Sequence, residues 1–142
     1  YTSEIRDSEG KRWGFKIISL DGKEDIMAGV DIISKYRVSK YGVNIDAIDR
    51  IAASAIRSAI ENNDIVVIDE IGRMELFSKE FANATIEALD SKKVVLGTVT
   101  AKNTNFTKKI KERNDTKIIK LTRDNFIEIE TYIQRKLKSI YG

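Results

Sequence analysis

The start of the chain alternates apolar and polar residues with a period of two, which predicts β-strands. Apolar residues at 13, 15 and 17 alternate with Gly14 and Lys16, so one face of this segment is apolar. Turn signals flank the segment, with Ser-Glu-Gly at 8–10 and Asp-Gly at 21–22. We therefore expect an antiparallel meander with strands near 2–7, 11–20 and 23–28, followed by a short extended piece ending at Gly42.

Beyond residue 43 the pattern changes to helices that alternate with short apolar runs. Apolar residues recur at helical spacing over 44–62, 78–90 and 122–140, with Asn44, Ser78 and Thr122 as expected N-caps. The runs 65–68 and 94–98 are typical of strands buried on both faces. We also expect a polar loop over 99–106, a short basic helix over 108–113 and a strand over 116–121.

This order of elements indicates an α/β fold. Helices alternate with strands after the meander, which is typical of a mainly parallel sheet flanked by helices. The 142 residues are the length of one domain, so we expect residues 1–142 to form a single domain with an N-terminal antiparallel hairpin or meander.

Composition excludes several kinds of chemistry. The chain has no Cys and no His, which excludes thiolate and histidine metal sites, cysteine nucleophiles and Ser-His-Asp triads. Catalysis would have to use carboxylates, Lys, Arg, hydroxyls, backbone amides or a hard cation with oxygen ligands. The net charge of +3 is weak evidence for nucleic-acid binding. With no apolar run of ~20 residues and no signal peptide at its start, we expect a cytoplasmic monomer without a nucleic-acid or membrane partner.

Polar residues follow the two predicted buried strands. Asp69 and Glu70 come directly after the first, and Thr98 ends the second. Ligands of open parallel sheets bind beyond the carboxyl ends of the strands. A carboxylate fixed there can hold Mg²⁺, and its neighbour can orient or deprotonate an attacking water. An acidic pair in this place is as often part of a solvated loop, so the spacing alone leaves both interpretations open.

A longer stretch around this pair resembles a known family. Residues 65–78, IVVIDEIGRMELFS, resemble the DEIG-(K/R)-MEL-(F/Y)-S segment of the THEP1-type nucleoside triphosphatases, small P-loop NTPases in which it forms the Walker B region. The similarity extends to T-x-E-I-R at 2–6, G-x-R-x-G-F-x-I at 10–17, YGV at 41–43 and LGT at 96–98. Leu121, Thr122 and Asn125 match part of a further family element, so the resemblance spans essentially the whole chain.

The resemblance implies a P-loop NTPase-like fold that hydrolyses nucleoside triphosphates, ATP and GTP among them, to the diphosphate and phosphate with Mg²⁺. Matched by position, Asp69 is the magnesium carboxylate and Glu70 the water-activating carboxylate. Arg73 and Glu75 belong to the same segment, residues 65–78, which we call the signature. They are expected to face the phosphates as catalytic residues.

Two further matches concern the nucleotide. The resemblance implies that Thr98 contacts the γ-phosphate or its water network, and that Asn125 belongs to the region that binds the base. Phe126 stands where the family usually has arginine, and it fits the apolar stripe of the last predicted helix. The loop at 100–103 lacks the arginines common in the family.

The largest departure is that the sequence contains no G-x-x-x-x-G-K-[ST] loop. In the family this loop lies in a βα unit before the hairpin, so we expect the sequence to lack an N-terminal segment of about 30 residues. Two other functions stay open: a nucleotide or polynucleotide kinase on the same fold, and a non-catalytic basic domain that binds RNA or protein.

Overall fold

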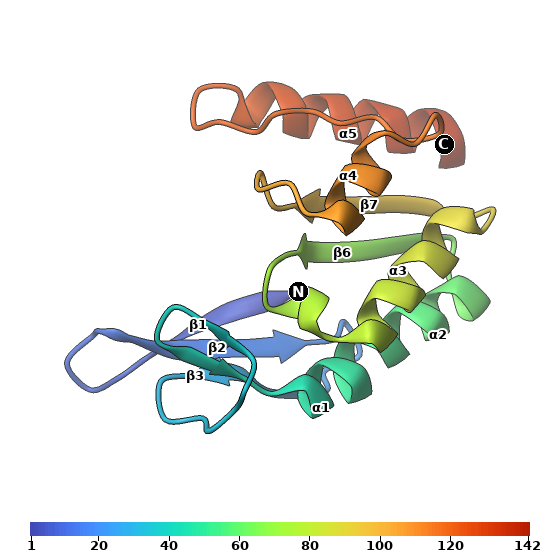
Figure 1. The fold of residues 1–142 in the computed structure, drawn as a ribbon. Helices are drawn as coiled ribbons and strands as arrows, with labels where there is room; N and C mark the ends of the chain where they lie inside the picture. Colours follow the sequence, from blue (N-terminus) through green and yellow to red (C-terminus); the bar gives the residue numbers. More distant parts are fainter. The chain divides into compact units, whose positions relative to one another are not determined.

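The computed structural model describes all residues, 1–142, and the chain divides into two compact units, Tyr1–Thr107 and Lys108–Gly142. Figure 1 shows the elements along the chain. The first unit holds all the strands: β1 (Thr2–Arg6), β2 (Arg12–Ile18), β3 (Glu24–Gly29), β4 (Arg37–Val38), β5 (Tyr41–Val43), β6 (Ile65–Ile71) and β7 (Val94–Val99). Its helical segments are α1 (Ile45–Ala47), η1 (Ile48–Ala53), α2 (Ser54–Asn62), η2 (Glu75–Phe77) and α3 (Lys79–Asp90). Helix α4 (Asn105–Lys111) crosses the boundary between the units, and α5 (Phe126–Tyr141) lies in the second.

The N-terminal strands form the expected antiparallel sheet, in the order β1-β2-β3-β5-β4. Its two tight turns use Gly10 and Gly22, at φ 78° and 91°, values that favour glycine. Ile17, Met27 and Val43 fill the face of the sheet that contributes to the core. The predicted meander is therefore confirmed, and the short extended piece near Gly42 is the pair β4–β5.

The predicted helix over 44–62 is present, but it is not regular. The Asn44 side chain accepts a hydrogen bond from the backbone N–H of Ala47 at 3.2 Å, as expected of an N-cap. Residues 48–53 then form a π-helical stretch, η1, before the chain returns to an α-helix. Ile48 and Ile56, which belong to the predicted apolar face, are buried, and Ile51 of the π-helical stretch is buried as well.

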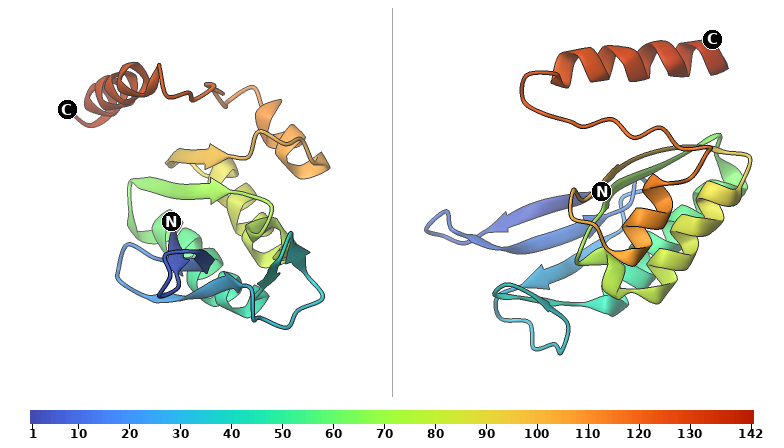
Figure 2. Two further views of the ribbon diagram at one scale, coloured as in Figure 1. Left: turned by 90° about the vertical axis from the view of Figure 1, so that its left-hand side faces the viewer. Right: turned by 45° about the horizontal axis from the view of Figure 1, so that its top comes forward.

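Strands β6 and β7 pair in parallel, as the order of elements predicted. Helices α2 and α3 lie side by side beside this pair (Figures 1 and 2), and α2 packs against β6. Val66 and Ile68 are buried, whereas Val67 between them is 48% exposed. Burial on both faces was therefore a wrong expectation for Val67, because alternate side chains point to opposite faces and, within the first unit, α2 packs on only one of them.

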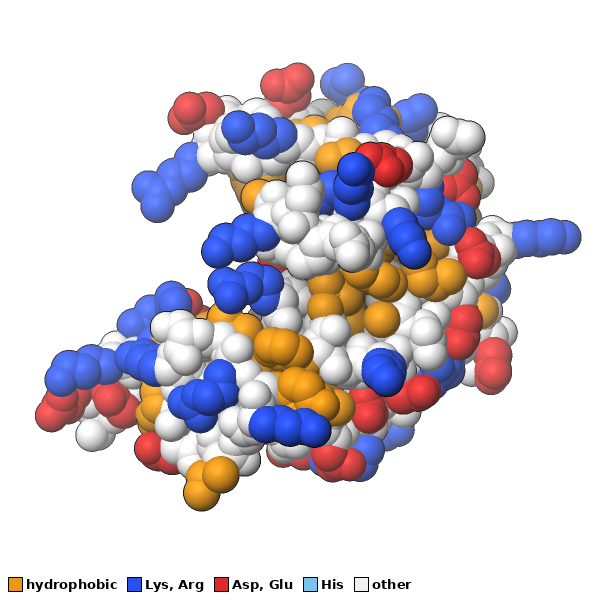
Figure 3. Space-filling view, viewed as in Figure 1, with side chains coloured by type: hydrophobic (Ala, Val, Ile, Leu, Met, Phe, Trp, Pro, Cys, Tyr) orange, Lys and Arg blue, Asp and Glu red, His pale blue; other side chains and the backbone are white.

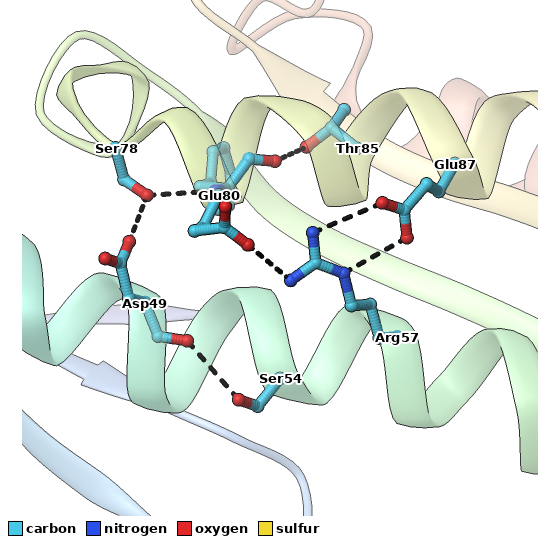
Figure 4. Close-up of polar contacts among 8 residues, drawn as sticks. Asp49, Ser54, Arg57, Ser78, Glu80, Thr85 and Glu87 are labelled. Carbon is cyan, nitrogen blue, oxygen red and sulfur yellow. Dashed lines mark hydrogen bonds and ion pairs between the residues drawn. The ribbon is translucent and has the colours of Figure 1, made fainter.

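Polar contacts join α3 to the preceding helix (Figure 4). The fully buried Ser78 caps α3 by accepting a hydrogen bond from the Phe81 N–H at 2.9 Å, and its hydroxyl donates to Asp49 of η1. Arg57 of α2 bridges Glu80 and Glu87 of α3. Exposed ion pairs contribute little to stability, so the buried Ser78 is the stronger anchor for the start of α3.

The second unit differs from the prediction in three respects. Residues 116–121 form no strand, and Ile118, Ile119 and Leu121 are 40–52% exposed, because the segment pairs with no other strand. The N-cap position of α5 is Asn125 instead of Thr122. Phe126 at the start of α5 is 54% exposed, so it is not a core residue.

Charged side chains on the β1–β2 hairpin are of both signs and interspersed (Figure 3). Arg6 and Arg12 both pair with Glu4, and Lys11 pairs with Glu9. This arrangement neutralises the hairpin locally and gives no basic stripe of the kind that binds a phosphate backbone. None of the helices combines the length and apolar composition that a membrane span requires.

Candidate functional site

The acidic pair sits in a bulge at the carboxyl end of β6. Ile68 pairs with Gly97 and Ile71 pairs with Val99, so two residues of β6, Asp69 and Glu70, stand opposite Thr98 alone. The peptide bond between these two acids is cis. Bulges redirect side chains at the edges of sheets, and here Asp69 and Glu70 are both exposed at the end of an otherwise half-buried strand.

Thr98 is the direct partner of Asp69. Its Oγ1 donates a hydrogen bond to Asp69 Oδ1 at 2.6 Å across the two parallel strands. The structure thus brings together two of the residues that the sequence predicted at this edge of the sheet. A hydroxyl that donates to one carboxylate oxygen fixes the carboxylate and leaves its other oxygen able to bind a ligand.

The oxygen donors here fit a hard divalent cation that is shared with a substrate. Asp69 and Thr98 supply carboxylate and hydroxyl oxygens, but no group of three or more acidic side chains converges as a complete metal site. Mg²⁺ is commonly held by one or two carboxylates, with water and substrate phosphates as the other ligands. A cavity of about 450 Å³ lies beside β6, and Asp69 and Glu70 are among the residues that line it.

Glu70 has a raised pKa. Partial burial is the main cause, and the negative charge of the neighbouring Asp69 adds to it. A carboxylate with a raised pKa is a better proton acceptor, as a residue that deprotonates or orients water requires.

Glu75 lies in the interior, in η2, with only 3% of its surface exposed. Burial raises the pKa of its carboxyl to about 7, and the charge of Glu70 adds to the rise. The N–H groups of Glu75 and Gly72 and the positive N-terminus of Tyr1 act in the opposite direction. The side chain is enclosed by protein in this structure, and a contact between Glu75 and the phosphates stays a prediction.

Arg73, the other signature residue, points the opposite way. It lies in the turn between β6 and η2 and is exposed. An exposed guanidinium close in sequence to the acidic pair is available to an anionic ligand.

Asn125 lies in the second unit and is engaged locally. Its Oδ1 accepts a hydrogen bond from the Thr122 N–H at 2.7 Å, and its Nδ2 donates to the Lys120 carbonyl at 2.8 Å. These bonds close the loop before α5. A contact between Asn125 and a nucleotide stays a prediction.

Gly72 is the site residue that the sequence reasoning missed. A Cβ at this position would lie 2.6 Å from Glu75 Oε2 and 2.7 Å from Glu70 Oε1, so only glycine leaves room for both carboxyl groups. The available signal was a glycine placed between two acidic residues in DEIGRME.

Comparisons with known proteins point to one family. The model of the family described as NTPase matches residues 1–134. The nucleoside-triphosphatase THEP1 of Thermotoga sp. (strain RQ2) is 44% identical over 125 residues, which cover 88% of this chain and 71% of that protein.

Two solved structures share the fold. The crystal structure of THEP1 from the hyperthermophile Aquifex aeolicus matches with a TM-score of 0.81 and 31% identity, over 94% of this chain and 78% of that one. The solution structure of a human cancer-related nucleoside triphosphatase matches with a TM-score of 0.80 and 28% identity, over 100% of this chain and 82% of that one.

Proposed function

The chain belongs to the family of THEP1-type nucleoside triphosphatases, and from this premise we propose a Mg²⁺-dependent hydrolysis of nucleoside triphosphates, ATP and GTP among them, to the diphosphate and phosphate. The observation that carries the proposal is the bulge at the end of β6. It presents Asp69 and Glu70 side by side, with Thr98 bound to Asp69. The family's activity favours hydrolysis over the kinase and the non-catalytic domain that the sequence left open.

Asp69 would hold the magnesium ion, with Thr98 fixing the orientation of its carboxylate. When bound, the ion neutralises charge on the β- and γ-phosphate oxygens. The 2.6 Å hydrogen bond from Thr98 sets which carboxylate oxygen faces the substrate. This is the usual function of the groups that surround a metal ligand.

Glu70 would accept the proton of the attacking water. It follows Asp69 directly in the bulge, so it would stand beside the residue that holds the ion and remain available to the attacking water. Its raised pKa, which burial and the charge of Asp69 cause, increases its affinity for that proton. Arg73 would offset the negative charge of the phosphates through its exposed guanidinium.

The test compares two isosteric variants of the full-length protein. Glu70→Gln is expected to lower phosphate release at least about 100-fold while nucleotide binding is retained, because only the proton acceptor is lost. Asp69→Asn is expected to weaken Mg²⁺-dependent nucleotide binding. Glu61→Gln, an exposed carboxylate at the end of α2, is the matched control for loss of one negative charge.

The outcomes separate the roles of the two acids. Full turnover by the Glu70→Gln protein would show that this residue is not the base. Unchanged Mg²⁺ dependence in the Asp69→Asn protein would remove Asp69 from the metal site. Phosphate transfer that requires an added acceptor, in place of release into water, would revive the kinase alternative.

A further inference from the structure

Two carboxyl groups of the signature meet across Gly72. Glu70 comes from the end of β6 and Glu75 from the turn η2, yet one oxygen of each lies within 2.7 Å of the point where Gly72 would carry a Cβ. The two oxygens are therefore less than twice that distance apart. Gly72 itself is buried.

Glu75 is enclosed by protein, unlike the other candidate residues of this site. Its side chain is 3% exposed, whereas Asp69, Glu70, Arg73 and Thr98 are all exposed. The chain turns between Arg73 and Glu75, with backbone hydrogen bonds from Leu76 to Gly72 and from Phe77 to Met74. One turn of 3₁₀ helix therefore directs Arg73 outward and Glu75 back beneath Gly72.

A second negative charge in this enclosed place is unfavourable. Glu70 stands next to Asp69, and a buried carboxylate facing that pair adds like charge at short range in a poorly solvated place. Two close carboxyl groups relieve this repulsion when one of them keeps its proton. Of the two, Glu75 is the more enclosed, so the free-energy cost of the neutral form is lower for Glu75 than for Glu70. This agrees with the raised pKa of Glu75.

We propose that Glu75 is a positioning residue, which fixes the carboxylate of Glu70 across Gly72, and that it contacts neither the triphosphate nor the metal ion. This inference rests on the proposed function, because it takes Glu70 as the group that activates water. The neutral carboxyl offers an O–H donor toward Glu70 and an acceptor toward the Gly72 and Glu75 N–H groups. Glu70 is then held in one orientation while it stays ionised.

The test is a comparison of Glu75→Gln with Glu75→Met in the full-length protein. Glutamine keeps one donor and one acceptor in the same shape, whereas methionine fills the same space without either. Glu75→Met is expected to lower kcat for GTP and ATP about 10- to 100-fold, with KM within twofold of the parent, because misplaced catalytic groups lose rate and not binding. Glu75→Gln is expected to lose no more than about fivefold.

The control pair is Glu61→Gln and Glu61→Met, at an exposed glutamate near the end of α2 that lies outside residues 65–78 and does not line the cavity beside β6. Both should behave like the parent protein. Urea unfolding of each variant shows whether it is folded under assay conditions. If Glu75→Met does not fold, Glu75→Gln alone decides. If Glu75 acts as an anion, Glu75→Gln would lower kcat as much as Glu70→Gln does, and this would overturn the proposal.

A double-mutant cycle shows whether Glu75 acts through Glu70. In the Glu70→Gln background, Glu75→Met is expected to lower the residual rate by less than twofold, because the group that it positions is already absent. A full further loss of 10-fold or more in that background would overturn the proposal and place Glu75 in direct contact with the reaction. Equal losses for Glu75→Gln and Glu75→Met would overturn it as well.

Failure of the proposed function gives a different result. If Glu70→Gln retains turnover, Glu70 is not the base, whatever the Glu75 variants do. If Glu70→Gln is inactive while Glu75→Met has parental kcat, only the positioning role of Glu75 is wrong.

Discussion

Gly72→Ala displaces both carboxyl groups of the signature without removing either of them. The new Cβ would lie 2.6 Å from Glu75 Oε2 and 2.7 Å from Glu70 Oε1, where ordinary contact begins at 3.4 Å. Both atoms are the ends of flexible side chains, and Gly72 is not among the glycines with a left-handed backbone, so alanine fits the main chain. The strain is therefore relieved by movement of the acids, each oxygen shifting by about 0.7 Å or more.

A shift of this size is large for a catalytic group. Misplacement by about 1 Å can lower a rate about 100-fold, so we expect kcat for NTP hydrolysis to fall about 10- to 100-fold, equivalent to about 1.4 to 2.7 kcal/mol in the activation free energy. The nucleotide KM should stay within twofold, because Asp69, Arg73 and Thr98 keep their positions. The assay is steady-state release of phosphate from GTP with saturating Mg²⁺.

The control substitutes another glycine. Gly10→Ala lies at the tip of the β1–β2 hairpin, with no atom within 4 Å of the added Cβ but with a left-handed φ of 78°. It should lower stability by about 1 kcal/mol and leave kcat unchanged. A Gly72→Ala protein with parental kcat would refute the view that close contact at Gly72 positions the two acids.

Three further predictions address stability and the metal site. Ser78→Ala removes the cap of α3 and the bond to Asp49, and should lower the unfolding free energy by about 1–2 kcal/mol in urea titrations; a change below 0.3 kcal/mol would contradict the anchoring role. Because burial raises the pKa of Glu75 from 4.5 to about 7, the native state keeps a proton that the unfolded chain has released. The unfolding free energy should therefore fall by about 3 kcal/mol as the pH rises from 4.5 to 7, and this fall should be absent in Glu75→Gln. Equal pH profiles of the unfolding free energy for the two proteins would contradict the raised pKa of Glu75. Thr98→Val removes the hydrogen bond to Asp69 and should raise the Mg²⁺ concentration for half-maximal rate about 10-fold, whereas Thr98→Ser should not.

Local signals in the sequence predicted much of the first unit correctly. Asn44 and Ser78 are caps whose side-chain chemistry is encoded within a few residues, and both cap the expected helices. The parallel pairing of β6 with β7 followed from the alternation of elements, and it explains why Asp69 and Thr98 meet although 29 residues separate them.

The wrong predictions concern properties that depend on distant partners. The apolar pattern at 116–121 is compatible with a strand, but a strand exists only where a second strand accepts its hydrogen bonds, and none does so here. Val67 matched a fully buried run, yet its exposure depends on what covers the second face of β6. The burial of Glu75 could not be predicted either, because the direction of this side chain depends on the turn η2.

The part of the signature that follows β6, from Ile71 to Ser78, is held at both of its ends, and this explains why its residues affect different properties of the protein. At its start, the Thr100 N–H donates to the Ile71 carbonyl at 3.1 Å and continues the β6–β7 ladder. At its end, Ser78 is buried and bound to Asp49. Between these anchors, the single turn from Gly72 to Phe77 decides which side chains meet the solvent and which the interior. Loosening an anchor should therefore lower the unfolding free energy first, whereas a change at Gly72 should lower the rate in a protein that is still folded.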